Sequence, residues 1–163
     1  MYRRANMGQN QVHLQRKTAG DPHRPAVLFV CVHNAGRSRM AEAIFNSLAG
    51  DRYRGISAGT EPAARPHPEV VEAVRANGLS LEERPGRMLT QELTDEAIKV
   101  IGMGCAVEDA CPALRVPLED WDLPDPKGRS PEEVEDIYNT IEMKVRNLIA
   151  KLDRELADPQ APL

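Results

Sequence analysis

A continuous apolar run at residues 27–32, Val-Leu-Phe-Val-Cys-Val, constrains the fold of this chain more than any other feature. The run lacks the alternation of a half-exposed strand and is rich in β-branched residues, as is typical of a strand buried on both faces of a parallel sheet. A loop containing Gly36 follows, and apolar residues then recur at helical spacing over residues 38–49. This order of strand, loop and helix predicts a unit of an α/β protein.

The alternation of strands and helices continues along the chain. Further strands are expected at residues 53–57 and 97–103, with a weaker fourth at 114–116, and further helices at 67–76, 90–96 and 131–156. We predict an α/β fold of three layers, with a doubly wound four-stranded parallel sheet between helices, in one domain over residues 25–156. Residues 1–24 are predicted to be a disordered extension and residues 157–163 a flexible tail.

The last predicted helix has the clearest start. Ser130 can cap it, Pro131 suits its first position, and Glu133 can complete a capping box.

Charge and hydropathy limit the classes of function. The formal net charge is −4 and Lys and Arg are interspersed with Asp and Glu, which argues against binding to nucleic acid. The longest apolar run is too short to span a membrane, and residues 1–24 lack the apolar middle of a signal peptide. We expect a cytoplasmic protein that is a monomer, because no helical segment carries a second apolar stripe.

Cys31 lies where the first strand ends and a helix is about to begin. A thiol in this place faces unpaired backbone N–H groups and the positive end of the helix dipole, and both favour the ionised thiolate. Gly36 lets the backbone curl, and Asn34 is the non-glycine residue best suited to a left-handed conformation in such a nest. The sequence therefore predicts a nucleophilic sulfur inside an anion-binding loop, which we call the anion loop; it consists of Cys31, Val32, His33, Asn34, Ala35, Gly36, Arg37 and Ser38.

Three polar side chains have predicted roles in the anion loop. Arg37 can bind two oxygens of a tetrahedral anion through its planar guanidinium. Two roles are open to Ser38: it can cap the following helix, or it can donate a hydrogen bond to the Cys31 sulfur when that sulfur leaves. Ser57, at the end of the second strand, is expected to brace the side chain of Asn34.

Residues 31–42, Cys-Val-His-Asn-Ala-Gly-Arg-Ser-Arg-Met-Ala-Glu, resemble the amino-terminal motif of thioredoxin-coupled arsenate reductases, which share the fold of low-molecular-weight protein tyrosine phosphatases. The resemblance covers about residues 27–152. It extends through Ser-Ala-Gly-Thr at 57–60, Met-Gly-Cys at 103–105, Cys-Pro at 111–112 and Trp-Asp-Leu-Pro-Asp-Pro at 121–126. It implies an arsenate reductase with this phosphatase-like fold.

The resemblance also implies roles for the remaining site residues. Cys31 would attack arsenate, Cys105 would attack Cys31 as arsenite leaves, and Cys111 would attack Cys105. Thioredoxin, a low-molecular-weight thiol or a glutaredoxin-type donor would reduce the final disulfide, so no bound cofactor is expected. Asp125 would protonate the leaving oxygen. On local pattern alone, Cys105 and Cys111 can also be read as small buried residues, and Asp125 as a turn residue.

No metal site is predicted from the cysteines and histidines. Cys105 and Cys111 are spaced more widely than in a zinc knuckle, and paired histidine ligands are missing from the sequence around them. His33 and His67 are therefore interpreted as structural or solvated side chains.

Some relatives hold a potassium ion beside the anion loop through oxygen ligands. Two of these ligands correspond to Asn34 and Glu42, but Pro85 and Arg87 stand where others would lie. We therefore predict that this chain binds no potassium.

Two alternative functions compete with arsenate reduction. A phosphatase would use Cys31, Arg37 and Asp125 to hydrolyse phosphomonoesters through a phosphocysteine, and the other cysteines would take no part. Phosphatases of this fold usually carry aromatic residues after the Asp-Pro pair, whereas Lys-Gly-Arg stands at residues 127–129 here. The third interpretation is a non-catalytic, anion- or redox-responsive binding protein that senses an oxyanion with the same loop.

Overall fold

The computed structural model describes residues 23–105, 107 and 114–157. Most of the two predicted tails, and Cys111, lie outside these ranges. The described strands are β1 (Ala26–Cys31), β2 (Arg54–Gly59), β3 (Ala97–Gly102) and β4 (Leu118–Asp120). The described helices are α2 (Arg37–Ala49), α3 (Pro68–Ala76), α4 (Gln91–Glu96) and α6 (Pro131–Ala157).

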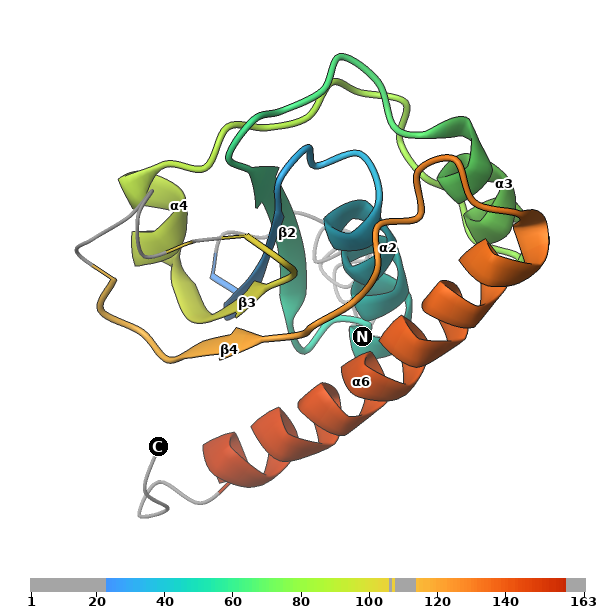
Figure 1. The fold of residues 1–163 in the computed structure, drawn as a ribbon. Helices are drawn as coiled ribbons and strands as arrows, with labels where there is room; N and C mark the ends of the chain where they lie inside the picture. The colour runs from blue at the N-terminus through green and yellow to red at the C-terminus, as the bar shows by residue number, and fades with distance from the viewer. Residues whose placement is uncertain (1–22, 106, 108–113, 158–163) are drawn as a thin grey trace, which may run out of the picture.

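The four strands form one sheet in the order β2-β1-β3-β4, and every neighbouring pair is parallel. All six residues of β1 are buried, because successive side chains enter the core on opposite faces of the sheet. Val27, Phe29 and Cys31 pack with side chains of α2, α3 and α6, whereas Leu28 and Val30 pack on the other face, to which α4 contributes Leu93. The predicted three-layer fold with a four-stranded parallel sheet is confirmed (Figure 1).

The long helix α6 runs diagonally across the molecule and covers one face of the sheet together with α2 and α3 (Figure 1). Its buried side chains recur at spacings of three and four residues: Val134, Ile137, Tyr138, Ile141, Val145, Leu148, Ile149 and Leu152. At its start, Ser130 Oγ accepts a hydrogen bond from the backbone N–H of Glu133 at 3.2 Å, which confirms Ser130 as the cap. Among the helices that the structure describes, none is both long and apolar enough to cross a membrane.

The predicted position of the fourth strand is wrong. We expected it at residues 114–116, but β4 is Leu118–Asp120 and pairs with Val100, Ile101 and Gly102 of β3. Leu114 and Val116 instead pack, partly buried, against the core on the α4 side of the sheet. The apolar pattern misled the prediction because β4 is an edge strand, where charged side chains such as Glu119 and Asp120 are common.

The carboxyl ends of β1 and β2 lie side by side, with Cys31 opposite Gly59 in the register. A side chain at Gly59 has no space, because an added Cβ would lie 2.6 Å from Val32 O and 2.8 Å from Asn34 N. Both of these atoms are backbone atoms of the anion loop. The close approach of β2 therefore sets the position of the loop.

Gly59→Ala should lower the free energy of unfolding by about 1–3 kcal/mol, because the loop backbone must move to admit the methyl group. Gly102→Ala, at the end of β3, is the matched control, since its added Cβ meets only side-chain atoms, the nearest being Val107 Cγ2 at 3.3 Å. Urea denaturation followed by the fluorescence of the single tryptophan, Trp121, measures both. A loss for Gly59→Ala no larger than that for Gly102→Ala would contradict this account.

Candidate active site

The carbonyl groups of the anion loop hold it against the segment that follows β2. Four backbone hydrogen bonds of 2.8–3.3 Å do this: Thr60 N to Cys31 O, Glu61 N to Val32 O, Ala63 N to His33 O and His67 N to Ala35 O. In a trans peptide the N–H points away from the preceding C=O. The N–H groups of residues 32, 33, 34 and 36 consequently point away from this segment, as an anion-binding nest requires.

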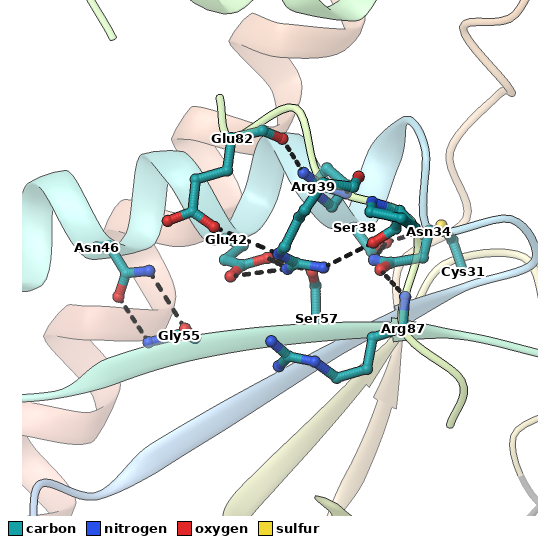
Figure 2. Close-up of polar contacts among 12 residues, drawn as sticks. Cys31, Asn34, Ser38, Arg39, Glu42, Asn46, Gly55, Ser57, Glu82 and Arg87 are labelled. Atoms are coloured by element: carbon teal, nitrogen blue, oxygen red, sulfur yellow. Dashed lines mark hydrogen bonds and ion pairs between the residues drawn. The ribbon is translucent and has the colours of Figure 1, made fainter. Parts of the chain in front are cut away.

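Asn34 has φ of 48° and is the only described non-glycine residue with a positive φ, which confirms the left-handed conformation expected for it. Its amide is fixed at both ends: Nδ2 donates to Ser38 Oγ at 2.8 Å, and Oδ1 accepts from the backbone N–H of Arg87 at 2.9 Å (Figure 2). The expectation that Ser57 braces Asn34 is wrong. Ser57 donates its hydrogen bond to the carboxylate of Glu42, which α2 places above β2.

The Cys31 sulfur lies 2.8 Å from Ser38 Oγ, and the side chains of both residues are buried. A thiolate carries no hydrogen, so Ser38 must be the donor when Cys31 is ionised. The capping role considered for Ser38 is wrong, because Gly36 is the N-cap of α2 and the helix has no side-chain cap. The Ser38 hydroxyl instead contacts the Cys31 sulfur and accepts a hydrogen bond from Asn34.

Arg37, in the first turn of α2, lies between two loops at the carboxyl edge of the sheet. Its Nη1 donates to the carbonyl of Leu123 at 2.9 Å, and the same nitrogen would be 2.7 Å from a Cβ added at Gly104. Only 9% of the residue is exposed. A guanidinium has five N–H donors, so the bond to Leu123 leaves others free to bind an anion, and that role remains a prediction.

The Asp-Pro loop packs against the anion loop. Pro126 Cγ is 2.9 Å from the position of a Cβ added at Gly36, so a side chain there would displace it. Asp125 is exposed, and its Oδ1 accepts from the backbone N–H of Lys127 at 3.0 Å, which is the turn expected from local pattern. The turn leaves the second carboxylate oxygen available, and the general-acid role of Asp125 remains a prediction.

His67 also lines the site, which the sequence did not indicate. Its Cδ2 is 3.2 Å from the position of a Cβ added at Gly36, on the same side as Pro126. The pKa of His67 is lowered, because the effect of burial exceeds that of the carboxylates of Asp125 and Glu69, which raise it. In the sequence, His67 stands before a helix, and this pattern predicted only where that helix begins.

Cys105 lies beside the base of the anion loop. Its sulfur, which is half-buried, donates to the carbonyl of Val30, the residue before Cys31, at 3.4 Å. Burial raises the pKa of the Cys105 thiol, and the nearby charge of Cys31 also raises it, whereas a backbone hydrogen bond with Met103 and the charge of Arg37 lower it. Cys31 and Cys105 are both free thiols in the structure, and Cys111 lies outside the described residues.

His33 of the anion loop, and the residues that correspond to potassium ligands in relatives, make contacts within the protein. His33 Nδ1 lies 3.1 Å from the carbonyl of Glu61. Glu42 pairs with Arg84 Nη2 at 3.1 Å, while Asn34 Oδ1 is bonded to the backbone of Arg87. Within the described ranges, no three His, Cys, Asp or Glu side chains are grouped as a metal site would need. The absence of bound potassium remains a prediction.

Comparison with known proteins places the chain among phosphatases and arsenate reductases. The family model described as low molecular weight phosphotyrosine protein phosphatase matches residues 26–158. A Halobacterium salinarum protein, whose name assigns it provisionally to the arsenate reductases, is 36% identical over 125 residues, which are 74% of this chain and 87% of that protein. The glutaredoxin arsenate reductase of a Synechocystis strain is 30% identical over 128 residues, 77% of this chain and 97% of the relative. The structure of a thioredoxin-dependent arsenate reductase from Corynebacterium glutamicum superposes with a TM-score of 0.69 at 30% identity, covering 90% of this chain and 72% of the other.

Ser38→Ala should move the pH at which Cys31 alkylation reaches half its maximal rate upward by about one unit, because the thiolate loses its hydrogen-bond donor. Iodoacetamide labelling over a pH series, with the Cys31 peptide quantified by mass spectrometry, measures this. Ser47→Ala, on the exposed face of the same helix, is the matched control and should leave the midpoint in place. An unchanged midpoint in Ser38→Ala would show that the hydroxyl does not stabilise the thiolate.

Cys105 should be alkylated with a higher pH midpoint in the folded protein than in the urea-unfolded chain. The pKa of this thiol is raised by burial, so the thiol stays protonated at neutral pH and ionises only as the pH rises further. Because the charge of Cys31 contributes to the shift, Cys31→Ser should bring the midpoint of Cys105 part of the way back. A folded midpoint equal to or below the unfolded one would contradict the burial of Cys105.

Proposed function

Because the chain belongs to the low molecular weight phosphotyrosine protein phosphatase family, we propose that it is an arsenate reductase, in which the thiolate attack that opens phosphatase chemistry leads to reduction. The proposal rests on the position of Cys105, whose sulfur contacts the carbonyl of the residue that precedes Cys31. A phosphatase needs only one cysteine. A reductase needs a second one that can come within disulfide distance of the first.

The first step is attack by the Cys31 thiolate on arsenic. The inward-facing N–H groups of the anion loop and the guanidinium of Arg37 bind the oxygens of arsenate and stabilise the charge that develops on them. A sulfur–arsenic bond forms and an arsenic–oxygen bond breaks. The departing group is a hydroxyl of arsenate, which takes the proton of Asp125 and leaves as water.

The second step is the reduction itself. Cys105 loses its proton as its sulfur attacks the Cys31 sulfur and a disulfide forms. The electron pair of the sulfur–arsenic bond passes to arsenic, and the departing arsenite takes up the proton. Arsenic goes from the +5 to the +3 state and arsenite departs. Cys111 then attacks Cys105, which releases Cys31 as a thiolate and leaves a Cys105–Cys111 disulfide.

An external thiol reductant completes the cycle by reducing this disulfide. We propose thioredoxin, with a glutaredoxin-type or low-molecular-weight thiol as the alternative donor. The names of two relatives support a thiol-protein donor of this kind, since one is called thioredoxin-dependent and the other a glutaredoxin arsenate reductase.

Phosphomonoester hydrolysis is the second candidate function, because the matching family is named for phosphatases and the same Cys31, Arg37 and Asp125 would serve it. The loop after Asp125 gives little support to an aryl substrate. It continues with Lys127, Gly128 and Arg129, none of them aromatic, and Arg129 pairs with Glu133 on α6 at 3.2 Å.

Two variants test the reductase against the wild type. With arsenate, NADPH, thioredoxin reductase and thioredoxin, the wild type should turn over repeatedly, whereas Cys31→Ser should produce no arsenite because it lacks the nucleophile. Cys111→Ala should release at most one arsenite per protein molecule, since without Cys111 the Cys31–Cys105 disulfide cannot be exchanged for a Cys105–Cys111 disulfide. Arsenite measured against protein concentration checks these numbers, and replacing thioredoxin by glutaredoxin with glutathione identifies the donor.

Two results would refute the relay. One is full multiple turnover of Cys111→Ala with thioredoxin. The other is rapid hydrolysis of an aryl phosphate by Cys105→Ala together with no arsenate reduction by the wild type, which would establish the phosphatase.

A further inference from the structure

The hydrogen-bond chain that reaches the Cys31 sulfur begins in a segment with neither helix nor strand. Residues 82–87 have no regular secondary structure, yet the backbone N–H of Arg87 fixes Asn34, and Asn34 fixes Ser38. The Arg87 carbonyl also accepts from the N–H of Gly59 at 2.8 Å. The geometry of the anion loop therefore depends on how firmly this irregular segment is held.

Arg39 holds the segment from the first turns of α2. Only 2% of Arg39 is exposed, and its guanidinium donates to two carbonyls of the segment, from Nη1 to Arg84 O at 3.1 Å and from Nη2 to Glu82 O (Figure 2). The carbonyls of Glu82 and Arg84 lie two residues apart in a segment that is not part of a strand, so no sheet hydrogen bonds satisfy them. A planar fork can meet both at once, whereas the single ammonium of a lysine offers no such geometry.

A second contact ties the segment to the same helix. Arg84 pairs with Glu42 at 3.1 Å, and Glu42 also accepts the hydroxyl of Ser57 on β2. The side chains of Arg84 and Glu42 are 23% and 20% exposed, so water screens this pair more than it screens Arg39. The buried guanidinium of Arg39 is accordingly the stronger of the two attachments of this segment to α2.

We infer that Arg39 is a positioning residue for the nucleophile: it holds residues 82–87 so that Arg87 orients Asn34, and Asn34 and Ser38 in turn orient the Cys31 sulfur. Arg39 touches none of the reacting atoms in this arrangement. The inference takes from the proposed function only that Cys31 is the nucleophile.

A purely electrostatic role is the competing explanation, because Arg39 is a cation near the site. Burial lowers the pKa of Arg39 and the charge of Arg84 lowers it as well, while Glu42 and Glu82 raise it. A charge effect on Cys31 would act directly through space. A positioning effect must pass through Asn34, and this difference can be measured.

The pH dependence of Cys31 alkylation in the full chain is the readout, since it needs neither arsenate nor a reductant and survives failure of the proposed function. Arg39→Met should raise the midpoint by about one pH unit. Arg39→Lys keeps the charge but loses the fork, so it should raise the midpoint by a similar amount. Arg54→Met is the matched control. Arg54 also donates to a backbone carbonyl, that of Arg24, but it lies at the amino end of β2, whereas the anion loop lies at the carboxyl ends of the strands.

A double-mutant cycle separates the two explanations. Asn34→Ala should raise the midpoint by itself, and adding Arg39→Met to Asn34→Ala should produce little further shift, because the link between them is already broken. Added guanidinium ion should restore part of the wild-type midpoint in Arg39→Ala, since Arg39 borders a solvent-connected cavity of about 230 Å³ that lies between α2 and residues 80–84.

Additive shifts in the double mutant, or a wild-type midpoint in Arg39→Lys, would overturn the inference. If Arg39→Met fails to fold, as judged by circular dichroism, the comparison of Arg39→Lys with Arg54→Met gives the same decision. Loss of stability in the Arg39 variants without any shift in the midpoint would assign Arg39 a structural role only and would equally overturn the inference.

Discussion

The left-handed backbone of Asn34 is the constraint on which the rest of the site depends. A non-glycine residue in this conformation costs about 1 kcal/mol, and it persists only where its surroundings fix it. Here one amide side chain joins the anion loop to Ser38 on one side and to Arg87 on the other. The turn of the backbone that exposes the N–H groups and the hydroxyl that reaches the sulfur are therefore set by the same residue.

The sheet provides the rigidity that this arrangement needs. β1 lies between β2 and β3, its side chains are buried on both faces, and its last residue is Cys31, the proposed nucleophile. The absence of a side chain at Gly59 lets the loop approach β2, and the absence of one at Gly36 lets Pro126 and His67 approach the loop. Two glycines thus let three separate segments of the chain pack against the anion loop.

Local pattern was enough to predict β1, the helix that follows it and the anion loop between them, because burial, helical spacing and loop composition are all encoded within residues 27–49. It was not enough for contacts made by distant segments. Arg87 is 53 residues from Asn34, and Arg39 is 43 residues from Glu82, so nothing near the motif indicates that these residues meet. The position of the edge strand β4 was not predicted for another reason: its exposed carboxylates give no apolar signal.

The burial of Cys31 limits what can reach it once it is oxidised. With 2% of the residue exposed, its sulfur is closed to the surface of another folded protein, whereas Cys105 is only half-buried. In the proposed reaction, a disulfide formed at such a buried sulfur must be transferred to a more accessible cysteine before a protein reductant can reach it. Cys105, which is more exposed than Cys31, would be the first cysteine to receive that disulfide.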